Sequence, residues 1–158
     1  MDSLSFEEIV SSYNSVITKI CYYFSESKEE FDDLRQETLI NLWKGLDKFR
    51  SDSKISTWIY RVCFNSCISF TRKNRNKVNL ISIDSIADIE TPGGFSTAQY
   101  NELHRLIAQL TTENKAIILM WLDEKSYDEI SEITGLNRNT VATRLARIKE
   151  QLVKMSNQ

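Results

Sequence analysis

Basic side chains recur on successive turns of a helix that the sequence predicts near the end of the chain. A guanidinium group pairs with phosphate through two parallel hydrogen bonds, and in a major groove it pairs with guanine in the same way. The spacing of these cations therefore indicates chemistry directed at nucleic acid, although a helical hairpin with a solvated basic face is the alternative. The cations are Arg138, Arg144, Arg147 and Lys149.

Two predicted helices joined by a tight turn position these cations. Ser126 and Glu129 have the spacing of a capping box, and Gly135 supplies a residue that tolerates the left-handed conformation at the end of the first helix. Asn137 can then cap the second helix. The order is typical of a helix-turn-helix, which lays its second helix in the major groove of DNA. The inward face of that helix comprises Val141, Leu145, Ile148 and Leu152.

A second cluster of functional side chains lies on the helix predicted from Ile55 to Arg72. Its aromatic, basic and amide members fall within about a quarter turn of one another. Single-stranded nucleic acid requires this combination, because bases stack on rings, amides read base edges and cations hold phosphates. The alternative places the tryptophan in the core and leaves the arginines solvated. The members are Trp58, Arg61, Asn65, Ile68 and Arg72.

The composition favours an all-α protein with two surfaces for DNA. The chain of 158 residues contains one proline and four glycines, and its apolar residues keep helical spacing almost throughout. The formal net charge is −2, yet the charges are segregated. No acid occurs from residue 53 to residue 83, and Glu150 is the only acid after residue 136. Two basic zones separated by acidic ones predict two DNA-facing surfaces.

The sequence offers no sign of a membrane span, a cofactor site or a metal site. No run approaches the roughly 20 apolar residues of a span, and no basic and apolar leader opens the chain, so we expect a soluble cytoplasmic protein without membrane insertion. Cys63 and Cys67 lack a second pair of ligands, and His104 lies far along the chain. We therefore expect these cysteines and Cys21 to be buried, reduced thiols.

The predicted elements form two small helical domains joined by a flexible linker. In the first, residues 1–77, capping-box spacings at Ser5 and Ser27 open two long helices. A polar loop, residues 49–53, then precedes the aromatic and basic helix.

The linker is predicted over residues 78–96, where the helical period fails around Pro92, Gly93 and Gly94. In the second domain, residues 97–158, two helices separated by a break at Thr111 cover the helix-turn-helix, which could not bury its apolar face alone.

Five short motifs occur in a fixed order along the chain. They are D-L-R-Q-E-T at Asp33–Thr38, K-F-R at Lys48–Arg50, T-W-I-Y-R-V at Thr57–Val62, S-Y-D-E-I at Ser126–Ile130 and T-V-A-T-R-L-A-R at Thr140–Arg147. In this order and spacing they closely resemble the sigma-70 family of bacterial RNA polymerase specificity factors, in particular its small extracytoplasmic-function (ECF) branch. The resemblance covers the chain from about Phe6 to Met155. It implies a sigma region 2-like helical bundle followed by a sigma region 4-like helix-turn-helix domain.

The resemblance implies three partners. The D-L-R-Q-E helix would dock on the clamp helices of the largest subunit of core RNA polymerase, and the second domain would meet the flap of the second-largest subunit. Promoter DNA is the second partner, and an anti-sigma factor is commonly the third. The residues implied for the clamp helices are Asp33, Arg35, Gln36, Glu37 and Asn41.

The resemblance also assigns residues to the two promoter elements. Phe49 and Asn65 would wall the pocket for a base flipped from the −10 strand, residues 51–54 including Lys54 would form its rim, and Trp58, Arg61 and Arg72 would grip the strand. The residues implied for −35 bases are Asn139, Ala142, Thr143, Ala146 and Arg147. Those implied for phosphates are Arg138, Arg144 and Lys149. Alanine at positions 142 and 146 suggests readout through thymine methyl groups or DNA shape.

The sequence therefore predicts a sigma factor that binds core polymerase, recognises the −35 and −10 elements and directs initiation. One alternative is a helix-turn-helix regulator that acts without polymerase and binds duplex autonomously. Another is a polymerase-binding or anti-sigma-type protein without promoter specificity. An enzyme is not expected, because the chain shows no phosphate-binding glycine loop and no His-acid or Cys-His pairing.

Overall fold

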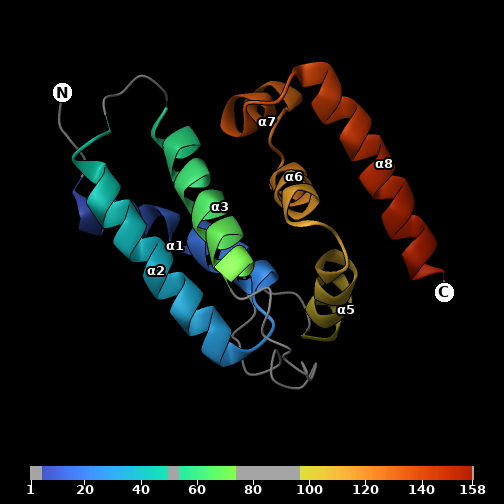
Figure 1. The fold of residues 1–158 in the computed structure, drawn as a ribbon, viewed down its shortest axis with the longest axis horizontal. Coiled ribbons are helices and arrows are strands. Elements are labelled where there is room, and N and C mark those ends of the chain that lie inside the picture. The colour runs from blue at the N-terminus through green and yellow to red at the C-terminus, as the bar shows by residue number, and fades with distance from the viewer. Residues whose placement is uncertain (1–4, 50–53, 74–96, 158) are drawn as a thin grey trace.

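Seven α-helices and no strand make up the part of the chain that the computed structural model describes, residues 5–49, 54–73 and 97–157 (Figure 1). The first three helices are α1 (Phe6–Phe24), α2 (Lys28–Leu46) and α3 (Ile55–Lys73). The remaining four are α5 (Thr97–Ala108), α6 (Thr112–Leu122), α7 (Tyr127–Thr134) and α8 (Arg138–Ser156). The all-α prediction is confirmed, whereas the predicted linker, residues 78–96, and most of the predicted loop lie outside the described residues.

The first domain is a bundle of α1, α2 and α3 around an apolar core. The side chains of Ser5 and Ser27 accept hydrogen bonds from backbone N–H groups at the starts of α1 and α2, as their spacing predicts. The three predicted thiols, Cys21, Cys63 and Cys67, are buried and free in this core. Burial raises the pKa of the Cys63 thiol, which is consistent with inert packing residues.

The second domain supports α8 on three shorter helices. Thr111 caps α6, and Ser126 with Glu129 completes a reciprocal capping box at the start of α7. Gly135 ends α7 in the left-handed conformation with φ of 78°, a region that residues with a Cβ rarely adopt. The side chain of Asn137 then accepts a hydrogen bond from the Asn139 backbone at the start of α8. The turn chemistry predicted for the helix-turn-helix is thus confirmed residue by residue.

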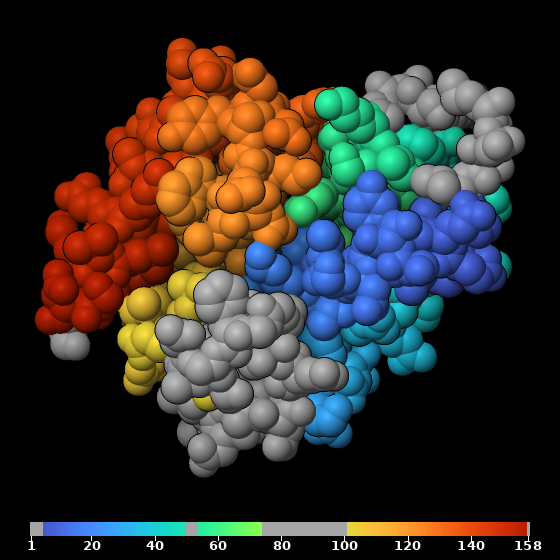
Figure 2. Space-filling model, turned by 180° about the vertical axis from the view of Figure 1, so that it is seen from behind, coloured from blue at the N-terminus to red at the C-terminus, as the bar shows by residue number. Residues whose placement is uncertain are grey.

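The two domains pack against each other. The helix α3 lies along α6 and α7, and α1 lies against α5 and α6; the view from behind shows the second domain seated directly on the first (Figure 2). One hydrophobic core continues from one domain into the other. The buried ring of His104 crosses the boundary, since its Nε2 lies 3.0 Å from the Tyr22 carbonyl oxygen and 2.7 Å from that of Ser25. Both acceptors are carbonyls, so Nε2 carries the proton.

Among the described residues, no helix has the length and apolar content needed to cross a membrane. The same residues hold no group of three or more His, Cys, Asp or Glu side chains arranged to bind a metal ion.

Candidate nucleic-acid interface

The helix α8 has one buried apolar face and one exposed polar face. Val141, Leu145 and Ile148 are 0–1% exposed and fix the helix against α6 and α7. The opposite face carries the exposed side chains Asn139, Thr143, Ala146 and Arg147. Because both sets repeat at helical spacing, burial of the first leaves the second directed at solvent. Ala142 is half-buried at the edge of this face.

Three more cations of α8 are implied for phosphates, and each lies beside another part of the second domain. Arg138 forms an exposed ion pair of 2.9 Å with Asp128. The ammonium of Lys149 lies 3.8 Å from the centre of the Trp121 ring, and Arg144 borders a recess with Arg147, Thr111, Glu113 and Asn114. Exposed ion pairs contribute little stability, so a DNA phosphate can replace Asp128 as the partner of Arg138 at small cost.

Two aromatic rings meet at the start of α3. The ring centres of Phe49 and Trp58 are 5.2 Å apart, and Gly45 on α2 makes room for the indole. A Cβ at position 45 would lie 3.2 Å from Trp58 Cζ2, closer than ordinary packing allows. The structure thus brings Phe49 and Trp58 together as one half-buried aromatic surface, with Lys54 exposed beside the start of α3. The remaining predicted rim residues, 51–53, lie outside the described residues.

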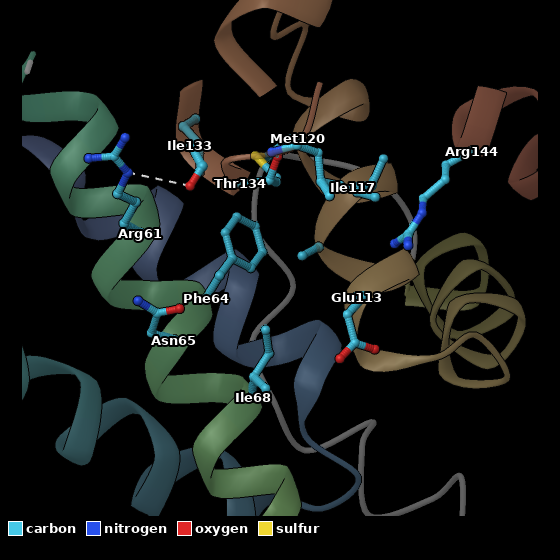
Figure 3. A pocket seen from close by; sticks show the side chains of 12 residues that line it. Arg61, Phe64, Asn65, Ile68, Glu113, Ile117, Met120, Ile133, Thr134 and Arg144 are labelled. Atoms are coloured by element: carbon cyan, nitrogen blue, oxygen red, sulfur yellow. Dashed lines mark hydrogen bonds between the residues drawn. The ribbon is translucent and has the colours of Figure 1, made fainter. Parts of the chain in front are cut away.

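The middle of α3 faces the second domain across a cavity of about 280 Å³ (Figure 3). Arg61 points toward the end of α7, where its Nε donates to the Ile133 carbonyl at 3.4 Å and its Nη2 donates to the Glu132 carbonyl. Asn65 is exposed and lines the same cavity. Near the end of α3, Arg72 lies 3.8 Å from Glu113 of α6 in an exposed ion pair.

The residues expected on the outer face of α2 divide into two groups. Asp33 and Gln36 are exposed, and Glu37 lies 3.4 Å from Lys73. Arg35 and Asn41 are half-buried rather than outward. Arg35 donates to Asn14 and Thr18 of α1, and Asn41 donates to the Ser66 hydroxyl of α3 at 2.9 Å. The physical reason is helical phase, because both residues lie beside the stripe that packs on α1 and α3.

Comparison with known protein families identifies the family of this chain. Residues 9–77 match the sigma-70 region 2 model, and residues 100–152 match a sigma-70 region 4 model. The chain belongs to the sigma-70 family. Sigma factors are transcription regulators rather than enzymes.

Curated relatives place this sigma-70 family member in the ECF branch. The ECF RNA polymerase sigma factor SigW of Bacillus subtilis is 28% identical in an alignment that covers 97% of this chain and 89% of the relative. The ECF RNA polymerase sigma-E factor of Haemophilus influenzae is 26% identical in an alignment that covers 96% of this chain and 87% of the relative.

Two solved structures share the fold. CnrH, solved in complex with the cytosolic domain of CnrY, aligns with a TM-score of 0.71 at 19% identity and covers 96% of this chain and 87% of that one. The sigma factor RpoE of Bartonella quintana, solved with the anti-sigma factor NepR, aligns with a TM-score of 0.76 at 19% identity, covering 96% of each chain.

Two exposed apolar residues of this sigma factor escaped the sequence-based assignment. Trp43 is 61% exposed and Ile40 is 44% exposed, although their hydrophobicity suggests core positions. Helical phase provides the missing signal, because positions 33, 36, 40 and 43 fall on one stripe, away from the buried Leu34 and Leu42. Ile40 and Trp43 are thus exposed apolar side chains within an otherwise polar stripe.

Proposed function

We propose that this ECF sigma factor divides promoter recognition among three faces. The outer face of α2 binds core polymerase, α3 with its flanking aromatic pair captures the opened −10 strand, and the exposed face of α8 reads the −35 duplex. The role requires the protein to work where the polymerase works, in the cytoplasm.

The observation that carries the proposal is the outer face of α2. Asp33 and Gln36 share a stripe with Ile40 and the largely exposed ring of Trp43. A stable protein interface combines an apolar or aromatic centre with a polar rim, and truncation of a central tryptophan commonly weakens binding most. The helix α2 lies on the side of the first domain opposite to the second domain (Figure 1), and the stripe is exposed in the structure as it stands.

The α8 face supports the second part of the proposal. A recognition helix reads bases through side chains near its start, while phosphate contacts fix its register. Asn139, Thr143 and Arg147 are exposed on the first turns of α8, where this reading occurs in helix-turn-helix proteins. We assign Arg138 and Arg144 to phosphates and Ala142 and Ala146 to apolar or shape readout.

The α3 face supports the third part. Phe49 and Trp58 offer aromatic surface to an unstacked base, and stacking of this kind is worth about 1–3 kcal/mol per base. Arg61, Asn65 and Arg72 follow along the same helix. A strand that stacks on the aromatic pair would extend along these side chains.

An anti-sigma factor belongs to this proposal as a partner. CnrH and RpoE, which share this fold, were each solved with a bound regulatory protein, CnrY and the anti-sigma factor NepR. The cavity beside α3 has an apolar wall of Phe64, Ile117 and Met120, which a partner's apolar side chains would fill.

Reconstitution with bacterial core polymerase tests the function. We expect the mixture to start transcription at defined genomic sites, and Trp43→Ala to weaken core binding by about 2 kcal/mol, as truncation of an interface hot spot does. Gln36→Ala with Glu37→Ala should also impair core binding without unfolding the chain.

Val153→Ala is the matched control, since Val153 is also an exposed apolar residue, 58% exposed, but lies near the end of α8. Core binding that is unchanged by Trp43→Ala would refute the assignment of the α2 face. Autonomous binding of promoter duplex, with no start sites on addition of polymerase, would instead support a conventional helix-turn-helix regulator.

A further inference from the structure

The contact between the two domains uses side chains that the −10 strand also requires. Arg61 donates to the carbonyl groups of Glu132 and Ile133 at the end of α7. A cation at this position is stabilised by the carbonyl groups that a helix leaves unpaired at its C-terminus. The proposed function counts the same guanidinium among the groups of α3 that grip the strand, and a side chain bonded to α7 is not available to a DNA strand.

The apolar part of the contact covers the same stretch of α3. Phe64 is 4% exposed and stands between Arg61 and Asn65 along the helix. It lines the cavity together with Ile117 and Met120 of α6, which are 1% and 0% exposed (Figure 3). The second domain therefore shields the middle of α3, while the aromatic pair at its start lies apart from this contact.

One carboxylate of the second domain contacts two helices of the first domain. Asp123, the residue that ends α6, receives the ammonium of Lys19 from α1 and the hydroxyl of Tyr60 from α3, the latter at 2.9 Å. The side chains of Lys19 and Asp123 are only 27% and 16% exposed. A partly buried pair is screened less by salt than a surface pair. We call these three residues the Asp123 latch.

The surroundings of Tyr60 reinforce the latch. Burial, together with the charge of Asp123, raises the pKa of the phenol, so the hydroxyl remains protonated and donates its hydrogen bond. The ammonium of Lys125, from the second domain, lies 4.8 Å from the centre of the Tyr60 ring, a distance at which a cation is attracted to an aromatic face. Each of these contacts joins α3 to the segment between α6 and α7.

We propose that the Asp123 latch holds this sigma factor in a self-inhibited form, in which the second domain occupies Arg61 and covers the middle of the −10 strand face of α3 until the latch is broken. The inference rests on the proposed function of α3. It assigns regulation to residues outside the DNA-binding and polymerase-binding sets. Because apparent affinity scales with the fraction of molecules in the competent form, weakening the latch must strengthen strand binding.

A charge exchange tests the latch. Lys19→Asp places two carboxylates together, Asp123→Lys places two ammonium groups together, and the double variant restores an opposite pair. Two quantities are measured without polymerase: the radius of gyration by small-angle X-ray scattering, and the affinity for short single-stranded DNA of random sequence. The matched control is Glu102→Gln, which removes a carboxylate from an exposed pair within α5.

We expect each single exchange to increase the radius and to raise strand affinity about tenfold, as a tenfold larger open fraction would. The double variant should return both quantities toward those of the unmodified chain, and Glu102→Gln should change neither. Single exchanges without effect, or an increase in radius without a gain in strand affinity, would overturn the proposal. Failure of the double variant to restore closure would also overturn it.

These measurements are made without polymerase, so their outcome can be told apart from that of the transcription test. Loss of transcription with core polymerase would refute the sigma-factor role, whereas the scattering and strand-binding results address only the latch.

Discussion

The two proposed nucleic-acid faces of this protein differ in how accessible they are in the structure. The face of α8 is open, since Asn139, Thr143 and Arg147 are exposed above a buried apolar stripe. The middle of α3 is closed, because Arg61 is bonded to α7 and Phe64 is buried beneath the second domain.

The difference matches the target that we propose for each face. Duplex DNA exists before the protein arrives, so a rigid helix can be prepared for its groove in advance. A single strand exists only after melting, which costs a few kcal/mol for each unstacked base. A face that opens only on the polymerase would avoid unproductive binding to other single strands. Because the α8 face is open and the middle of α3 is covered, we expect the two faces to respond to different substitutions and conditions.

The largest expected effect is on the open face. Arg147→Ala should weaken promoter use by about 1–3 kcal/mol if the guanidinium reads a base, and less if it contacts a phosphate. The loss should be the same with and without Lys19→Asp, because effects at distant, independent sites add. The measurement is initiation by the reconstituted polymerase on a mapped promoter and on variants of its −35 element.

Lys154→Ala is the control for this substitution. Lys154 is an exposed cation on the last turn of α8, paired with Glu150, and we expect only a small effect on initiation. If Arg147→Ala caused no loss of initiation in a chain that also carries Lys19→Asp, DNA reading by α8 would depend on the contact between α3 and the second domain.

A smaller effect is expected from acid, and it should act on the contact between the domains. Burial lowers the pKa of His104 below its usual 6.5. As pH falls below 6.5 the unfolded chain therefore takes up a proton that the packed imidazole does not, and stability decreases. The slope is at most about 1.4 kcal/mol per pH unit for one proton.

Urea denaturation at a series of pH values measures this slope. His104→Gln keeps an N–H donor for the two carbonyl groups without titrating, and thus removes the contribution of His104. The contribution of Glu30 to the pH dependence remains in this variant, because burial raises the pKa of that carboxyl. An identical pH profile for this variant would mean that His104 is not the sensitive group.

Local structure was the part most accessible from the sequence. Ser126, Gly135 and Asn137 act through their own backbone and near neighbours, so capping rules located α7 and α8 closely. The exposed faces of α8 followed from periodicity in the same way. The five motifs then identified the family, which helical pattern alone did not.

Contacts between segments that lie far apart in the sequence could not be predicted in this way. Asp123 is an unremarkable acid at a helix end, and only the packed fold brings Lys19 and Tyr60 to it. The hydrophobicity of Trp43 alone suggests a core position, whereas the side chain is 61% exposed on α2. The half-buried positions of Arg35 and Asn41 likewise depend on how α2 packs on α1 and α3.

The smallest expected effect concerns α7, a helix that contacts both α3 and α8. Its start positions the helix-turn-helix, and its last carbonyl groups receive Arg61. Ser126→Ala removes the capping hydroxyl, which should cost about 1 kcal/mol of stability. Ser5→Ala is the matched control, because it deletes the same bond at the start of α1, away from either face.

Urea denaturation should show similar losses for both variants. Only Ser126→Ala should both weaken −35 duplex binding and raise affinity for single strands, since loosening α7 disturbs the open face and releases the closed one. Equal behaviour of the two variants in the binding assays would mean that α7 does not couple the faces.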